Sequence, residues 1–155
     1  MPEFELPKPG EFYEIFSKGN PNLLLDVREA SQNDGAQVIL WPRHFAFNQQ
    51  WSFEELGGGG ALPRYKIVAR HSGKCLDVFE AKEDDGTPVI QFGFGGGANQ
   101  MWDFFWDNVG THFSLRAVHS SKFLDAFEGA TQGTHLIQFQ ANGQPNQFWG
   151  FSPVG

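Results

Sequence analysis

An acidic side chain, an aromatic ring and a side-chain amide recur three times along the chain at nearly constant spacing. In the first occurrence, Asp26 precedes Trp41 by 15 residues, and Asn48 follows seven residues later. The other occurrences are Asp77 with Phe92 and Asn99, and Asp125 with Phe139 and Asn146. A carboxylate accepts several hydrogen bonds, an amide donates and accepts, and a ring offers a flat apolar face. This combination suits a neutral ligand with paired hydroxyls and one apolar face, which is the chemistry of a sugar ring.

Two short motifs carry these residues and divide the chain into three units. Leu-Asp-Val or Leu-Asp-Ala occurs at residues 25–27, 76–78 and 124–126, and Asn-Gln-x-Trp occurs at 48–51, 99–102 and 146–149. The aspartate precedes the tryptophan by 25, 25 and 24 residues. This constancy predicts three copies of one structural unit. The predicted units are residues 11–63, 64–110 and 111–155 of a single domain, preceded by an N-terminal arm over residues 1–10 that is mobile or docked at a sheet edge.

Each unit is expected to contain four short strands. A segment that alternates apolar and polar residues, such as Tyr65 to Ala69, precedes each aspartate motif, and a Gly-containing turn separates that motif from the next apolar run. Twelve short strands without a helical period predict an all-β closed sheet. Because one four-strand unit has a single apolar face, three units must close on one another to bury it.

Composition and charge favour one domain and disfavour several classes of partner. The 155 residues include 17 Phe and 5 Trp, which can anchor a core without disulfides. Lys and Arg number 11 against 18 Asp and Glu, so the basic stripe needed to bind nucleic acid is missing. The sequence contains no signal peptide and no apolar run long enough to insert into a membrane. We expect a cytoplasmic protein, or one secreted without a signal peptide; the oligomeric state is left open, with a dimer as one alternative.

The three repeats resemble the ricin B-chain type lectin family, whose members carry the Gln-x-Trp motif in each repeat. The resemblance covers residues 11–153. It implies a β-trefoil, which is a six-stranded barrel capped by three hairpins, and it implies glycan binding without catalysis at up to three shallow sites. The disulfide positions of secreted members are not occupied by cysteine pairs, so no disulfide is expected, and Cys75 is expected to be a small buried residue. No metal and no other cofactor is expected.

The resemblance also assigns roles to the recurring residues. In such lectins the aspartate takes two adjacent hydroxyls, the aromatic ring stacks on the sugar, and the asparagine gives a further hydrogen bond. The expected sugar-binding residues are Asp26, Trp41, His44, Asn48, Asp77, Phe92, Asn99, Asp125, Phe139, Asn142 and Asn146. The glutamines expected to orient the aspartates from behind are Gln49, Gln100 and Gln147. We expect the first site to be the best formed and the second the weakest, because Gly95 replaces His44 in a glycine-rich loop.

Several alternatives accompany this interpretation. Many family members have a glutamine where this chain has Ile39, Ile90 and Ile137, so one polar contact to the sugar is missing here. The expected ligand is therefore a galactose-type sugar or another terminal sugar. The aspartates could instead brace turns through backbone N–H groups. The fold could serve as a protein-binding scaffold, such as a protease inhibitor similar to the mycocypins, or as the carbohydrate-targeting module of a larger glycosidase or toxin. Recurrence of all three residue types in every unit favours a lectin with multivalent glycan recognition, for example in defence or toxicity.

Overall fold

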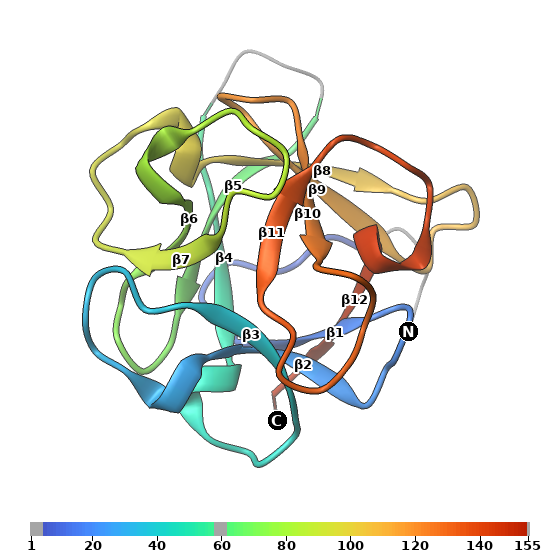
Figure 1. The fold of residues 1–155 in the computed structure, drawn as a ribbon. Coiled ribbons are helices and arrows are strands. Elements are labelled where there is room, and N and C mark those ends of the chain that lie inside the picture. Colours follow the sequence, from blue (N-terminus) through green and yellow to red (C-terminus); the bar gives the residue numbers. More distant parts are fainter. Residues whose placement is uncertain (1–4, 58–61, 155) are drawn as a thin grey trace.

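Twelve short strands make up the computed structural model, which describes residues 5–57 and 62–154 (Figure 1). The strands of the first unit are β1 (Tyr13–Ser17), β2 (Leu23–Val27), β3 (Val38–Pro42) and β4 (Trp51–Glu55). Those of the second are β5 (Arg64–Ala69), β6 (Cys75–Val78), β7 (Val89–Phe92) and β8 (Trp102–Trp106). Those of the third are β9 (Phe113–Ala117), β10 (Phe123–Ala126), β11 (Leu136–Phe139) and β12 (Trp149–Pro153). The predicted all-β fold of twelve strands is confirmed.

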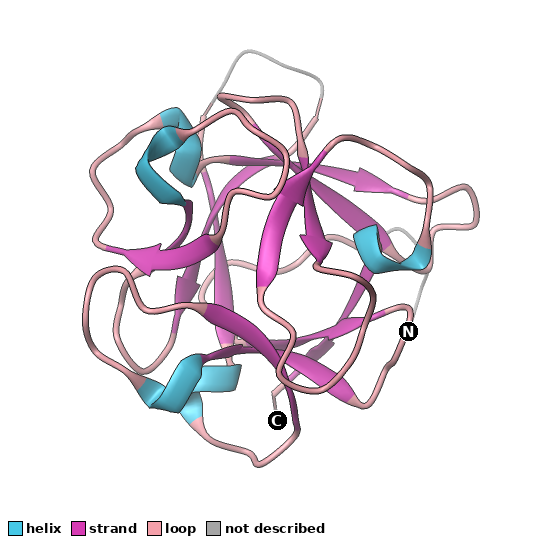
Figure 2. Cartoon of the chain, viewed as in Figure 1, coloured by secondary structure: helices cyan, strands magenta, loops and turns pink. Residues whose placement is uncertain are grey.

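Within the described part of the chain, five helical turns of three residues each lie between strands. They are η1 (Arg28–Ala30), η2 (Phe47–Gln49), η3 (Phe79–Ala81), η4 (Ala98–Gln100) and η5 (Pro145–Gln147). Figure 2 shows that they gather at three places around the rim of the molecule. Within the described ranges, none of the helices is long and apolar enough to cross a membrane.

Six strands close into an antiparallel barrel. Around the ring, β1 pairs with β12, β12 with β9, β9 with β8, β8 with β5, β5 with β4, and β4 again with β1. A closed ring leaves no edge strand with unpaired backbone groups. Closure therefore satisfies the backbone hydrogen bonds that a single unit would leave exposed.

Three hairpins cap one end of this barrel. They are β2–β3, β6–β7 and β10–β11, and Figure 1 shows β3, β7 and β11 arranged around the middle of the view. Isolated bridges join neighbouring hairpins at Gln37 with Ile90, Pro88 with Ile137, and Ile39 with His135. A six-stranded barrel with three capping hairpins is the predicted β-trefoil, and it contains no disulfide among the described residues.

Side-chain hydrogen bonds also join units one and two, and units two and three, beside these bridges. The Nε2 group of Gln91 donates to the carbonyls of Ser31 at 2.8 Å and Asn33 at 2.9 Å, so unit two is tied to unit one. Gln138 makes the corresponding bonds from unit three to unit two. Leu40 occupies the same position in unit one and is fully buried. The boundary between units three and one is therefore closed by backbone hydrogen bonds and apolar packing.

The Gln-x-Trp tryptophans lie in the core. Trp51, Trp102 and Trp149 are fully buried. Each indole N–H donates to the carbonyl of the leucine in the Leu-Asp motif of its own unit, at 3.1, 3.1 and 3.3 Å. A buried indole has its only polar group satisfied in this way. The tryptophans thus connect the loop that carries Asn-Gln to the strand that carries the aspartate.

Residues 5–10, the described part of the expected N-terminal arm, are docked on the barrel. Pro7 is buried, and the Lys8 N–H donates to the Tyr13 hydroxyl at 2.8 Å. The expectation for residues 1–4 lies outside the described residues. Cys75 is buried as expected, and burial raises the pKa of its thiol to about 12.

We predict that Trp51→Ala lowers the free energy of unfolding by roughly 3 to 5 kcal/mol, because it leaves a cavity in the barrel and removes a buried hydrogen bond. Chemical denaturation followed by circular dichroism measures this loss. The matched control is Trp41→Ala, which removes a ring that is 39% exposed and should cost about 1 kcal/mol or less. Equal stabilities of the two variants would contradict the assignment of Trp51 to the core.

Candidate functional site

The three aspartates lie on the outer face of buried strands, close to the strand ends. In β2, Leu25 and Val27 point into the core, and side chains alternate along a strand, so Asp26 points the other way. Even so, Asp26 is only 3% exposed, and Asp77 and Asp125 are equally buried. A buried carboxylate requires hydrogen-bond donors around it.

Two side-chain amides supply those donors in every unit. Asn48 Nδ2 donates to Asp26 Oδ1 at 3.2 Å, and Gln49 Nε2 donates to Asp26 Oδ2 at 2.9 Å. The corresponding distances are 3.2 and 2.8 Å at Asp77, and 2.9 and 2.8 Å at Asp125. Among the described hydrogen bonds, none joins these carboxylates to a backbone N–H, so the turn-bracing alternative is not what holds them.

The glutamine of each Gln-x-Trp motif fixes a loop as well as the aspartate. Gln49 Nε2 also donates to the Pro42 carbonyl at 2.9 Å, and its Oε1 accepts from the His44 N–H at 3.0 Å. Gln100 bonds in the same way to the Gly93 carbonyl and the Gly95 N–H. Gln147 repeats the pattern in unit three. Each glutamine thus contacts both the aspartate and the loop that follows the aromatic residue, and its orienting role remains a prediction.

The turn that follows each aspartate has an unusual backbone. Glu29 and Ala30 have φ values of +58° and +50°, in the left-handed region that non-glycine residues seldom occupy. The same two positions are left-handed in the other units, at Glu80 with Ala81 and at Glu128 with Gly129. This turn forms one wall of the pocket in each unit. These wall residues were not among the expected site residues, although the Glu-Ala or Glu-Gly that follows each aspartate motif is a recurring signal in the sequence.

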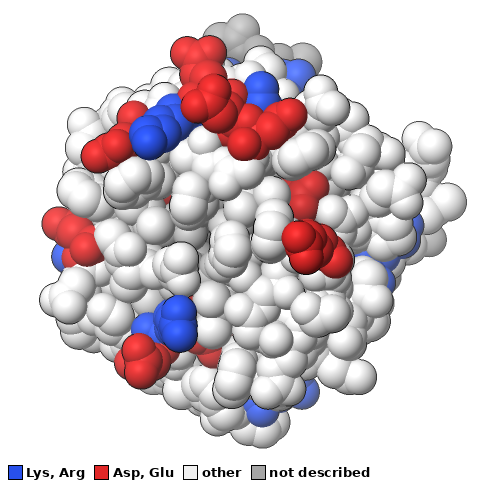
Figure 3. Space-filling model, in the orientation of Figure 1, with Lys and Arg blue, Asp and Glu red and all other residues white. Residues whose placement is uncertain are grey.

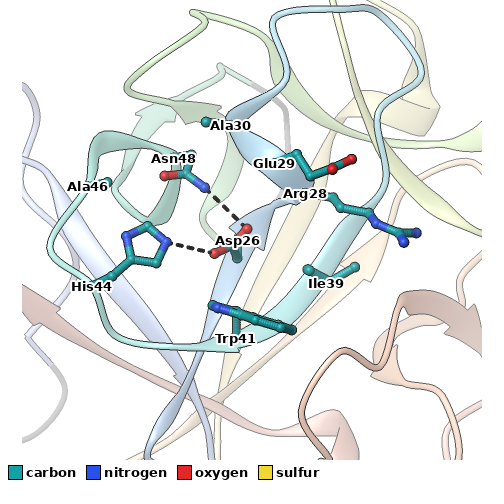
Figure 4. A pocket seen from close by; sticks show the side chains of 9 residues that line it. All are labelled: Asp26, Arg28, Glu29, Ala30, Ile39, Trp41, His44, Ala46 and Asn48. Carbon is teal, nitrogen blue, oxygen red and sulfur yellow. Dashed lines mark hydrogen bonds and ion pairs between the residues drawn. The ribbon is translucent and has the colours of Figure 1, made fainter.

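The pocket of unit one brings the expected residues together. It has a volume of about 520 Å³ and is lined by Asp26, Arg28, Glu29, Ala30, Ile39, Trp41, His44, Ala46 and Asn48. Figure 4 shows the Asp26 carboxylate between the His44 and Asn48 side chains, with the Trp41 ring beside it. His44 Nε2 lies 3.3 Å from Asp26 Oδ2. All four residues expected at the first site therefore face one cavity.

The pocket of unit two is smaller, and it is also lined by the recurring aspartate, aromatic residue and asparagine. Its volume is about 320 Å³, and its lining is Gly35, Asp77, Phe79, Glu80, Ile90, Phe92 and Asn99. The Phe92 ring is 43% exposed. Gly35 belongs to the hairpin turn of unit one, so two units form this pocket together.

The pocket described in unit three is lined by the expected asparagines, one of which, Asn146, also bonds to Asp125 at 2.9 Å. It has a volume of about 410 Å³ and is lined by Gly19, Glu128, Gly129, Ala130, Asn142, Gln144, Pro145 and Asn146. Asn142 and Asn146 thus face it, whereas Asp125 and Phe139 are not among its lining residues. The Asn142 side chain is occupied by the Gln144 N–H, which donates to its Oδ1 at 2.9 Å. Gly19 comes from unit one, so this pocket also crosses a unit boundary.

Burial dominates the electrostatics of the three carboxylates. It raises the pKa of Asp26, Asp77 and Asp125, while the glutamine and asparagine amides act in the opposite direction. At Asp26 the neighbouring His44 also lowers the pKa. Around these sites the capping face is largely uncharged at its centre, with charged groups mainly toward its periphery (Figure 3). The described residues include no group of three or more His, Cys, Asp or Glu side chains placed to hold a metal ion.

Two protein-family models match the sequence and together span nearly the whole chain. The ricin-type β-trefoil lectin domain-like model matches residues 3–92, and the ricin-type β-trefoil lectin domain model matches residues 63–155. A search of curated proteins found no match.

Solved structures share both the fold and part of the sequence. ThreeFoil, a designed threefold-symmetric protein, is 39% identical over 92% of this chain and 99% of its own, with a TM-score of 0.85. An exo-β-1,3-galactanase from Clostridium thermocellum is 30% identical over 97% of this chain, with a TM-score of 0.86, and the match covers 32% of the galactanase. The Macrolepiota procera ricin B-like lectin, solved in complex with lactose, shares the fold at 21% identity, with a TM-score of 0.77 over 97% of this chain and 100% of its own.

We predict that the three buried aspartates make the stability of the protein decrease as the pH rises. Their pKa values are raised in the folded state, so between the unfolded and folded pKa the folded protein binds more protons. Their contribution to the free energy of unfolding is therefore most favourable below the unfolded pKa and is lost as the pH rises through the folded pKa. Urea denaturation at a series of pH values should show a flatter profile for the Asp26/Asp77/Asp125 triple alanine variant, and identical profiles would contradict this prediction.

Proposed function

Because the chain belongs to the ricin-type β-trefoil lectin domain family, we propose that it is a non-enzymatic glycan-binding protein with sites beside Asp26, Asp77 and Asp125. Carbohydrate binding is supported by the family and by the lectins that share this fold. The pockets identify the residues that we propose to bind glycans. The first pocket gives the strongest support for this proposal.

The observation that carries the proposal is the arrangement around Asp26. A carboxylate has about four lone-pair positions, and the amides of Asn48 and Gln49 occupy one on each oxygen. His44 Nε2 lies 3.3 Å from Asp26 Oδ2, and Asp26 lines a pocket that also has the partly exposed Trp41 indole in its wall. Two adjacent sugar hydroxyls can donate to this fixed acceptor while the apolar face of the sugar lies on Trp41. Because the donors are already in place, binding does not require the site to reorganise.

We propose that the sites differ in strength, with the first strongest and the second stronger than the third. In unit two, Asp77, Phe92 and Asn99 line one pocket. In unit three the pocket is lined by asparagines without the aspartate or the aromatic residue. This order differs from the sequence-based expectation, which ranked the second site lowest because of its glycine-rich loop. Gln100 holds that loop through the Gly95 N–H at 2.8 Å, as Gln49 and Gln147 hold the loops of the other units, so the glycine-rich loop gives no reason to rank the second site lowest.

The ligand we propose is a neutral terminal sugar, with galactose-type sugars as the first candidates. Ile39 and Ile90 form part of the walls of the first and second pockets and contribute no hydrogen-bonding group. Selectivity among sugars would then depend on the aspartate, the asparagine and, at the first site, His44. The relative in complex with lactose supports testing galactosides first.

A second candidate function is that of a carbohydrate-targeting module attached to an enzyme. The chain is 30% identical to a galactanase but spans only about a third of its length. In that setting the chain would supply binding through the same pockets, and the catalytic activity would reside in another part of the enzyme. Both candidate functions require the aspartate sites.

A glycan array probed with the labelled protein tests the proposal. We expect wild type to retain glycans and the Asp26/Asp77/Asp125 triple alanine variant to lose them. In a background with Asp77→Ala and Asp125→Ala, the further change Asp26→Ala should weaken binding roughly ten- to a hundredfold, because a hydrogen bond to a charged group contributes about 1.5 to 3 kcal/mol.

The control variant for this array is Asp84→Ala, which removes an exposed carboxylate from a hairpin turn. It should bind as wild type does, and circular dichroism should show that every variant is folded. Retention of no glycan by the wild-type protein would refute the lectin proposal. Equal retention by wild type and the triple variant would place the binding sites elsewhere on the molecule.

A further inference from the structure

Phe45 breaks the threefold symmetry of the chain, because it places a bulky residue where the backbone conformation favours glycine. Phe45 lies three residues before Asn48, and the same position in the other units is occupied by Gly96 and Gly143. All three residues are left-handed, with φ values of +65°, +83° and +69°. Glycine adopts this conformation freely, whereas the Cβ of an L-residue is crowded by the following carbonyl. Two units thus have the residue that suits the backbone, and unit one has a bulky ring.

Burial does not compensate for the strain at Phe45. The side chain is 73% exposed, more than any other large apolar residue among those described. A phenyl ring in solvent gains almost nothing from the hydrophobic effect. Its presence at a position that favours glycine is therefore not explained by packing in the folded chain, and a contact with a ligand is a sufficient reason.

The backbone on both sides of Phe45 is fixed. The His44 N–H donates to Gln49 Oε1 at 3.0 Å, and the Gln49 N–H donates to the Ala46 carbonyl at 3.1 Å. The same glutamine therefore holds the residue before Phe45 and the residue after it. Held at both neighbours, the loop keeps Phe45 in its strained conformation and in one place.

The ring of Phe45 also has a rigid support. The Arg43 guanidinium lies 5.3 Å from the ring centroid, at the distance of a cation–π contact. Arg43 is itself anchored by two bonds to the Glu14 carboxylate, at 2.6 and 3.1 Å. Glu14 is buried on β1 of the barrel. Through Arg43, the exposed ring is thus connected to the barrel.

The residues that flank Phe45 both belong to the first pocket. His44 and Ala46 line it, and Figure 4 shows them along one side, on the loop that leaves Trp41 and returns to Asn48. Phe45 lies between them in the sequence and is not itself a lining residue, so a ligand would reach its ring only by extending beyond the cavity. The first pocket is also larger than the pocket of unit two, at about 520 against 320 Å³.

We propose that Phe45 is a specificity-determining residue that contacts the second sugar of an oligosaccharide whose terminal sugar occupies the first pocket. This inference rests on the proposed glycan-binding function and deepens it. The ligand class of the first site is then an oligosaccharide of two or more residues. The second and third sites, with glycine at the same position, bind terminal sugars without this contact.

Calorimetric titration of the Asp77→Ala/Asp125→Ala protein, which retains only the first site, tests the proposal. The probes are pairs that share a terminal sugar: galactose with lactose, N-acetylglucosamine with chitobiose, glucose with cellobiose, and mannose with mannobiose. For at least one pair, the disaccharide should bind roughly three- to tenfold more tightly than the monosaccharide, as one ring contact allows. Phe45→Gly and Phe45→Ala should both abolish this preference and leave monosaccharide binding unchanged.

The two substitutions separate the ring from the backbone. Phe45→Gly removes the ring and the strain, so its melting temperature should equal or exceed that of the parent, whereas Phe45→Ala removes the ring alone. A disaccharide preference that survives both changes would overturn the proposal. A preference lost only in the Phe45→Gly variant would also overturn it, because the effect would then come from loop rigidity. A melting temperature lowered by many degrees in Phe45→Gly would overturn it as well. Failure of the proposed glycan-binding function gives a different result, because the Asp77→Ala/Asp125→Ala parent would then bind neither the monosaccharide nor the disaccharide of any pair.

Discussion

The amide of the Gln-x-Trp glutamine is the interaction on which the sites depend. In unit one, Gln49 joins three segments through one side chain: the aspartate on β2, the carbonyl of Pro42 at the end of β3, and the loop N–H of His44. The tryptophan two residues later is bonded to the carbonyl of the residue before that aspartate. Fold and site are therefore fixed by neighbouring residues of one motif. A change that frees the glutamine would release the carboxylate and the loop together.

Much of this arrangement could be predicted from the sequence because it depends on spacing alone. The constant interval between Asp26 and Trp51, and its recurrence in the other units, requires three equivalent units, and a unit with one apolar face must close with others. The burial of the tryptophans and the placement of the aspartates beside the glutamines follow from that closure. The closed all-β sheet of three units is thus predictable from residue periodicity, whereas its arrangement as a β-trefoil is implied by the resemblance to the ricin B-chain type lectins.

The remaining features depend on backbone angles and side-chain packing, which spacing does not determine. The left-handed turn at Glu29 and Ala30 makes a pocket wall from residues that a strand pattern places in an ordinary turn. In unit three, the same residue types recur, but the lining of the described pocket includes Gly19 of unit one and does not include Asp125 or Phe139. Phe45 is ordinary as a residue type and informative only when its φ angle is compared with those of Gly96 and Gly143.

The second and third pockets each include a glycine from unit one, whereas the lining of the first pocket lies entirely within unit one. A ligand bound in the second pocket would touch Gly35 of one unit and Asp77 of the next, and so would connect two units across their boundary. Such a site exists only when the ring of units is closed. A ligand bound there would therefore lower the population of molecules in which neighbouring units have separated. Glycan at these boundaries would make the ring more resistant to opening, and to proteases that attack opened forms, without altering its shape.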